Sequence, residues 1–203
     1  IYNIMILDAC NEIGSEGRSD QQLDHIYDNV LRNEPAIRRV ETGELEGQIN
    51  TPEGLRRFEK VLVIGLGQLG LPVAKYLTER GFETSGYDIN NTAMERAEKV
   101  ASVRKVTKLS EIDVFIICVS THRPEDMFSP QVDGLLSIVK EISKEAKSGA
   151  LVSIESTIPR GTSKKVFEML NHRLHVVHVP HRWYALEEME HGVNQLRVIG
   201  GIH

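Results

Sequence analysis

Residues 60–70 read Lys60-Val61-Leu62-Val63-Ile64-Gly65-Leu66-Gly67-Gln68-Leu69-Gly70, an apolar run that ends in Gly-x-Gly-x-x-Gly. The pattern then becomes helical, from Leu71 to Arg80. A strand that passes through such glycines directly into a helix is typical of the first turn of a dinucleotide-binding unit. We expect Gly65 to turn the chain, Gly67 to admit a diphosphate to the backbone, and Gly70 to allow close packing of the helix.

The residue that would hold the adenosine ribose follows at a suitable distance. A second strand-like run, residues 82–87, ends at Asp88, close to the spacing of about 20 residues after Gly70 that such units show. A carboxylate there can accept both ribose hydroxyls and would repel a 2′-phosphate, and no Arg or Lys follows through Asn91. The sequence therefore predicts NAD rather than NADP. The alternative is a glycine-rich turn beside a surface aspartate, with no ligand.

Composition narrows the class of protein. The chain has 203 residues, of which 40% are hydrophobic and 26% charged, as in an ordinary globular protein. A net charge of −5 without a basic block argues against a nucleic-acid partner. No apolar run approaches the roughly 20 residues of a membrane span, and the first residues do not resemble a signal peptide. We expect a cytoplasmic protein in which Cys118 is a buried core thiol.

Residues 1–57 lie outside the nucleotide-binding pattern and predict a helical extension with a polar, glycine-bearing linker. An apolar stripe at helical spacing is formed by Leu23, Ile26, Tyr27, Val30 and Leu31. This stripe must be buried, and the linker lets it reach away from the main domain. We expect it to pack against a second copy of the chain and form a homodimer. The alternatives are packing on the main domain or an add-on without a partner.

From residue 58 to 203 strand-like and helical patterns alternate. The strand-like runs are 60–64, 82–87, 113–119, 150–155, 175–179 and 196–199, with a weak one near 103–106. The helical patterns are 70–80, 91–100, 131–147, 162–171 and 184–191. Continuously apolar runs suit parallel strands covered on both faces. The sequence predicts a doubly wound, mostly parallel α/β domain of the Rossmann type, with ligands beyond the carboxyl ends of its strands.

Four motifs in this domain resemble those of the UDP-glucose/GDP-mannose dehydrogenase family of nucleotide-sugar dehydrogenases. Residues 65–74 resemble its glycine motif followed by Leu-Pro-Leu-Ala, and 117–121 its Ile-Cys-Val-Pro-Thr. Residues 155–162 resemble its Glu-Ser-Thr-Val-Pro-Pro-Gly-Thr, and 197–201 its Val-Val-Gly-Gly. The resemblance covers about residues 59–202. It implies a Rossmann fold, NAD as the cofactor, and a nucleotide sugar as the substrate.

The departures from the family pattern concern catalysis. Family members continue into a second domain that supplies a catalytic cysteine in Gly-Gly-x-Cys, and this motif does not occur among the 203 residues. The family's Pro-Glu-Arg is Pro180-His181-Arg182 here, and the second proline of its Pro-Thr-Pro is His122. Oxidising an aldehyde to an acid needs a nucleophile, usually a thiolate. A partner chain would have to supply it, unless the sequence is a fragment of a longer dehydrogenase.

The residues expected at the site lie at the strand ends. The resemblance assigns Thr121 and Glu155 to the ordering of water and to acid/base work. His181 is a candidate for substrate contact or proton transfer because it follows a strand end beside Arg182 and Trp183. The expected NAD contacts are Gly65, Gly67, Gln68, Leu69, Gly70, Asp88, Val119, Ser120 and Glu155. The alternatives are a helix cap for Glu155, a turn hydroxyl for Thr121 and an ordinary loop histidine for His181.

No metal site is expected. The histidines at 175, 178 and 181 recur at a spacing that alternates between the faces of a strand, so all three cannot easily reach one ion. The preferred function is an NAD-dependent oxidoreductase that oxidises an alcohol of a nucleotide sugar, alone or with a partner chain. The competing hypothesis is an NAD-binding sensor or scaffold without catalysis.

Overall fold

The computed structural model describes residues 58–122, 125–126, 128–180 and 199–202. The chain divides between residues 56 and 57 into two units, and all described residues belong to the second. The helical extension expected for residues 1–57 and the helix expected at 184–191 therefore lie outside the described residues.

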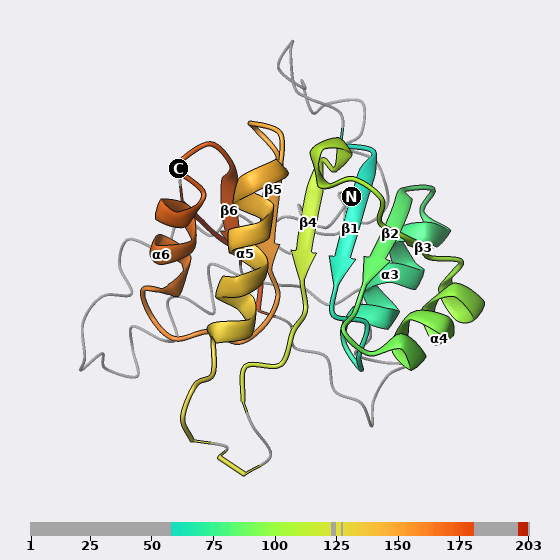
Figure 1. Cartoon of the computed structure of the whole chain (residues 1–203), viewed down its shortest axis with the longest axis horizontal. Helices are drawn as coiled ribbons and strands as arrows, with labels where there is room; N and C mark the ends of the chain where they lie inside the picture. The colour runs from blue at the N-terminus through green and yellow to red at the C-terminus, as the bar shows by residue number, and fades with distance from the viewer. Residues whose placement is uncertain (1–57, 123–124, 127, 181–198, 203) are drawn as a thin grey trace, which may run out of the picture. The chain divides into compact units, whose positions relative to one another are not determined.

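A seven-stranded sheet in the order β3-β2-β1-β4-β5-β6-β7 forms the centre of the described unit (Figure 1). The strands are β1 (Lys60–Ile64), β2 (Glu83–Tyr87), β3 (Arg104–Lys105), β4 (Val114–Ile117), β5 (Leu151–Ile154), β6 (His175–His178) and β7 (Gly200–Ile202). Every pairing from β3 through β6 is parallel, and β7 runs antiparallel to β6. The predicted doubly wound, mostly parallel sheet is confirmed.

Helices lie on both sides of this sheet. They are α3 (Gly70–Glu79), α4 (Asn91–Ala101), α5 (Asp133–Glu145) and α6 (Thr162–Met169), with a short 3-10 helix η2 (Leu109–Glu111). In Figure 1, α5 lies in front of the sheet and α3 behind it. Helix α4 begins where the side chain of Asn90 accepts a hydrogen bond from the N–H of Thr92, an N-cap that satisfies one free donor of its first turn.

The core follows from the alternation of side chains along the central strands. One face of the sheet packs against α5 and α6, in a cluster that includes Phe115, Val152, Leu135 and Leu170. Val63 on the other face is also fully buried. Burial of each large apolar side chain contributes about 1.5–3 kcal/mol. The core thus fixes the positions at which the parallel strands end, and the candidate site lies at those ends.

Strands β4, β5 and β6 end one or two residues earlier than the sequence predicts, whereas β1 and β2 end where it predicts. For β4 the reason lies in the neighbouring β1. Beyond Ile64 the chain turns at Gly65, so the neighbouring β4 loses its ladder partner after Ile117. The N–H of Cys118 still donates to the carbonyl of Ile64, at 2.8 Å, and the chain then leaves the sheet. At the other end of the domain, β7 begins at Gly200, after the predicted run 196–199, of which 196–198 lie outside the described residues.

At the amino edge of the sheet Asp113 joins the starts of β1 and β4. Its Oδ2 accepts hydrogen bonds from the N–H groups of Glu59, at 3.0 Å, and Lys60, at 2.9 Å, and its Oδ1 pairs with Lys147. Burial alone would raise the pKa of Asp113, but the Lys147 ammonium and the two N–H groups outweigh it and lower the pKa to about 2. The carboxylate is therefore ionised wherever the domain is folded at ordinary pH.

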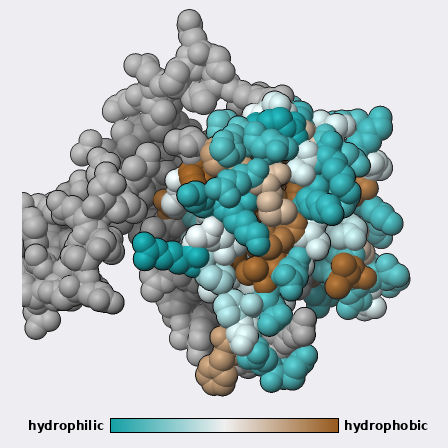
Figure 2. All heavy atoms as spheres, turned by 60° about the vertical axis from the view of Figure 1, so that its left-hand side comes forward, coloured by the Kyte–Doolittle hydropathy of each residue, from teal (hydrophilic) through white to brown (hydrophobic). Residues whose placement is uncertain are grey.

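The surface drawn in Figure 2 is mostly hydrophilic, with hydrophobic residues in small separate groups. Within the described ranges, no helix combines the length and the apolar character that crossing a membrane requires.

Candidate cofactor-binding site

The glycine loop lies where the strand order reverses, between β1 and β4, at their carboxyl ends. In sheets of this kind ligands bind at such a point. Gly65 has φ = 88°, which L side chains rarely adopt, and a Cβ there would lie 2.5 Å from the carbonyl oxygen of Cys118. A Cβ on Gly70 would lie 1.7 Å from the carbonyl oxygen of Gly65. Both positions therefore require glycine for the loop to close.

Gly67 differs from the other two glycines of the motif. A Cβ built on it meets no atom within 4 Å, so the protein itself leaves this space open. The next residues lead into α3, whose first turn carries no acidic side chain. The N–H of Leu71 donates to the carbonyl of Gly67 at 3.2 Å, and Pro72 has no N–H, so an anion here would meet the N–H groups before Leu71 and the positive end of the helix dipole. A dinucleotide diphosphate suits this arrangement, because the absence of a side chain at Gly67 leaves room next to the backbone.

Leu66 connects the glycine loop to β2, to Asp88 and to α4. Its side chain is fully buried, and its methyl groups lie close enough to Gly86 on β2 that a Cβ there would approach within 2.9 Å. Its N–H donates to Oδ2 of Asp88 at 2.7 Å, and its carbonyl accepts from Nη2 of Arg96 on α4 at 3.2 Å. The sequence did not single out Leu66 or Arg96, and both help to set the shape of the loop.

Asp88 lies directly after β2 and is half-buried. Besides Leu66, it binds the N–H of Asn90, which donates to Oδ1 at 2.8 Å. Each carboxylate oxygen has two lone pairs, so each retains capacity for one further donor. Asp88 is therefore both a structural part of the loop and a group that can accept two ribose hydroxyls.

Side-chain hydrogen bonds connect the segments that follow β4 and β5, next to the glycine loop. Ser156 Oγ donates to the carbonyl of Val119 at 2.7 Å, and Thr121 Oγ1 donates to the carbonyl of Thr157 at 2.8 Å. Val119 also lies next to the turn, with Cγ1 at 3.2 Å from a Cβ built on Gly65. The exposed Ser120 bonds locally, to the carbonyl of His122 at 3.1 Å. The structure thus brings the predicted residues of β1 and β4 to one place.

Glu155 is buried, with 2% of its surface exposed, at the end of β5. Its N–H donates to the carbonyl of Ile117 on β4 at 2.9 Å. The N-cap position of α6 is occupied by Gly161, so Glu155 is not the N-cap residue of that helix. Thr121 is more than a local turn residue, because its hydroxyl bridges two strand ends.

His181 lies outside the described residues, and the histidine that the structure does place at this edge is His178. Its Nε2 lies 3.2 Å from the carbonyl oxygen of Ser156. A carbonyl only accepts, so in this contact Nε2 is the donor. The spacing of the histidines in the sequence indicated His178 only as a possible metal ligand. Its position as the last residue of β6 could have indicated a place at the site.

Among the residues that the structure describes, no group of three or more potential ligand side chains could hold a metal ion. His175 is exposed at the opposite end of β6 from His178, so these two do not converge.

A parallel sheet with a glycine turn at its switch point and an acid after the second strand defines a dinucleotide-binding α/β protein. The chain belongs to the UDP-glucose/GDP-mannose dehydrogenase family, since the family model of its NAD-binding domain matches residues 94–203. The cofactor is accordingly NAD.

Curated relatives agree with this assignment. The chain is 33% identical over 168 residues to a UDP-N-acetyl-D-mannosamine dehydrogenase of Methanococcus maripaludis, a match that covers 72% of the chain and 39% of the relative. A protein of the same description from Campylobacter jejuni is 29% identical, with 72% and 41% covered. The chain therefore spans about two fifths of the length of the curated relatives it matches.

Solved structures show the same fold. A UDP-N-acetyl-mannosamine dehydrogenase from Staphylococcus aureus matches with a TM-score of 0.57 and 27% identity, over 71% of this chain and 42% of that one. A UDP-glucose dehydrogenase from Pyrobaculum islandicum matches with a TM-score of 0.56 and 21% identity, over 74% and 42%, and supports the fold alone.

Proposed function

We propose that this chain is the cofactor-binding part of an NAD-dependent dehydrogenase that oxidises an alcohol of a nucleotide sugar. The named relatives act on UDP-N-acetyl-D-mannosamine, so a UDP-linked N-acetylhexosamine is the first substrate to test. The observation that carries the proposal is the glycine loop, in which Gly67 faces open space while Leu66 is held by Asp88.

NAD, when bound, supplies the hydride acceptor, and the protein supplies position and proton transfer. The loop from Gly65 to Gly70 would hold the diphosphate on its backbone, and Asp88 would accept the ribose hydroxyls. Val119 and Ser120 would line the cofactor between the strand ends. These assignments are supported by the topology of the sheet, because the glycine loop and the end of β4 both lie at the switch point.

Alcohol oxidation also needs a base, and we propose that Thr121, Glu155 and His181 act near the reacting alcohol. Thr121 follows β4 and Glu155 follows β5, and these two strands are adjacent and parallel, with Ile117 paired to Ile154. A buried carboxylate can take up or release a proton where water is largely excluded. The later step to the acid requires a thiolate, which we assign to a cysteine-bearing domain outside this sequence, in the same protein or in a partner chain.

We further propose that residues 1–57 mediate homodimer formation and that the protein works in a cytoplasmic, reducing setting. The apolar stripe from Leu23 to Leu31 supports the first. Buried Cys118 forms no disulfide, which is compatible with the second.

Calorimetric titration of the chain with NAD and NADP, followed by assays of NADH formation, tests the function. The assays use a panel of UDP- and GDP-linked sugars, with and without a chain that carries the Gly-Gly-x-Cys domain. We expect NAD to bind more tightly than NADP, and NADH to form with at least one sugar. If the wild-type chain does not bind NAD, both the proposed cofactor site and the proposed function are wrong.

The second candidate is an NAD-binding sensor or scaffold, favoured by the replacement of the family's Pro-Glu-Arg by Pro180-His181-Arg182. It predicts NAD affinity without turnover in every combination of the assay, and a change of oligomeric state when NAD binds. The two candidates therefore differ in NADH formation, which only the first requires.

A further inference from the structure

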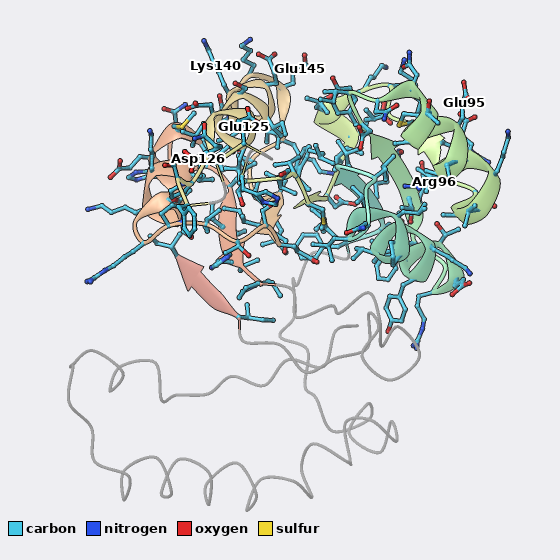
Figure 3. The ribbon with its side chains drawn as sticks, turned by 90° about the horizontal axis from the view of Figure 1, so that it is seen from below. Glu95, Arg96, Glu125, Asp126, Lys140 and Glu145 are labelled. Carbon is cyan, nitrogen blue, oxygen red and sulfur yellow. The ribbon has the colours of Figure 1, made fainter. Side chains whose placement is uncertain are left out.

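Arg96 extends from the middle of α4 to the glycine loop, although 30 residues separate it from Leu66 in the sequence. Figure 3 shows the domain from the carboxyl edge of the sheet, with Arg96 directed inward from α4 and its neighbour Glu95 directed outward. Nη2 of Arg96 donates to the carbonyl oxygen of Leu66 at 3.2 Å. An exposed helix residue thus contacts the backbone of the loop that holds the cofactor.

The direction of this hydrogen bond has a geometric consequence. In a trans peptide the C=O of one residue and the N–H of the next point in opposite directions. Arg96 holds the Leu66 carbonyl toward α4, so the N–H of Gly67 must point away from α4. That is the N–H of the one glycine in the motif whose missing Cβ leaves open space.

The peptide between Gly65 and Leu66 shows the same opposite orientation of its C=O and N–H groups. The N–H of Leu66 is held by Asp88 at 2.7 Å, so the carbonyl of Gly65 must point the opposite way. It does, because its oxygen lies 1.7 Å from the place where a Cβ on Gly70 would be. Both peptides that flank Leu66 are therefore fixed from the β2–α4 side, one by a carboxylate and the other by a guanidinium.

We propose that Arg96 is a positioning residue for NAD, which orients the N–H of Gly67 toward the cofactor diphosphate by holding the Leu66 carbonyl. This inference rests on the proposed NAD site. Without the guanidinium, the Leu66–Gly67 peptide can rotate, since Gly67 tolerates a wide range of backbone angles. The N–H would then lose its fixed direction, and binding the diphosphate would have to restore it.

The test compares Arg96→Met with the full wild-type chain for three ligands: NAD, ADP-ribose and adenosine. NAD and ADP-ribose contain the diphosphate, and adenosine does not. We expect Arg96→Met to weaken NAD and ADP-ribose about tenfold, the usual effect of one hydrogen bond to a charged partner, and to change adenosine less than about twofold. Arg104→Met, on β3, removes the same charge away from the loop and should leave all three affinities unchanged.

The amide signal of Gly67 in NMR spectra provides a second readout that general destabilisation would not mimic. In the wild-type chain it should shift strongly with ADP-ribose, and in Arg96→Met much less. Equal NAD affinity in Arg96→Met and wild type would overturn the role of Arg96, and so would an equal loss for adenosine and ADP-ribose. If the wild-type chain binds no NAD, the proposed NAD site is wrong. If the wild-type chain binds NAD and Arg96→Met binds it equally well, only the proposed role of Arg96 is wrong.

Discussion

The backbone N–H of Leu66 donates a 2.7 Å hydrogen bond to Oδ2 of Asp88, which links the middle of the glycine loop to the acid after β2. The residue expected to recognise ribose therefore also supports the loop expected to bind the diphosphate. A substitution at this position changes two parts of the cofactor site at once. Its effects on affinity should accordingly exceed those of a lost ribose contact.

Asp88→Ala and Asp88→Asn should separate these two roles. Alanine removes both acceptors, so NAD affinity should fall about a hundredfold, while asparagine keeps one acceptor and should lose only about tenfold. Preference for NAD over NADP should decline in both, because the charge that repels a 2′-phosphate is gone. Calorimetric titration measures all four affinities. Identical NAD affinities in the two variants would contradict the supporting role of Asp88.

Gly67 and Gly70 should respond in opposite ways to an added side chain. Gly67→Val has open space around it, so the ligand-free domain should keep its stability while NAD binding is lost by steric exclusion. Gly70→Ala should lower the free energy of unfolding by about 3 kcal/mol, because its Cβ would collide with the Gly65 carbonyl. Thermal unfolding without ligand and NAD titration measure the two effects. Destabilised Gly67→Val would show that this space is filled.

Asp113 should make the stability of the domain depend on pH. Its pKa is lowered from 3.8 to about 2 in the folded state, so its stabilising contribution is complete above the unfolded value and is lost as pH falls toward 2. Linkage gives about 2 kcal/mol at pH 7 and about half of that near pH 3. Denaturant unfolding of wild type and Asp113→Asn at both pH values should show this decrease.

The matched control for Asp113 is the surface ion pair of Glu141 with Lys144, whose charged atoms are 2.7 Å apart. Exposed pairs of this kind contribute little, so Glu141→Gln should cost less than about 0.5 kcal/mol at pH 7. A difference between wild type and Asp113→Asn that stays constant from pH 7 to pH 3 would disprove the assigned pKa.

Glu155→Gln should distinguish catalysis from cofactor binding. The amide keeps the shape of the side chain and removes its ability to accept a proton, so turnover in the reconstituted assay should fall at least about a hundredfold. NAD affinity should fall far less than turnover, because Glu155 is one of several expected NAD contacts, and the proposed diphosphate and adenosine ribose contacts involve other residues. Steady-state NADH formation and calorimetry test the two parts. Unchanged turnover would exclude Glu155 as the base.

The sequence predicted the sheet because the determinants of each parallel strand are local. A continuous apolar run such as Val61–Ile64, followed by glycine and a helical pattern, allows one interpretation of the fold. The turn at Gly65 was predictable for the same reason. The antiparallel direction of β7 was not, because a run of two glycines carries no information about its partner strand.

The parts of the site that escaped prediction depend on contacts between distant residues. Arg96 was missed because it lies in the sequence pattern of a helix and not at a strand end, whereas the fold places the second turn of α4 beside the loop. Leu66 occupies a variable position of the motif, so the motif does not indicate its role. Its side chain lies next to Gly86, and this contact follows from the pairing of β1 with β2. His178 reaches the edge because β6 lies next to β5, in a register that pairs it with Ile154.

The carboxylate of Asp113 holds the chain at Glu59 and Lys60, where β1 begins. A pulling force on the preceding segment would load these two hydrogen bonds and the parallel ladder of β1 before it reached Gly65. Along the chain, these hydrogen bonds and the ladder of β1 lie between Gly65 and the residues before 58, so such a force meets them first.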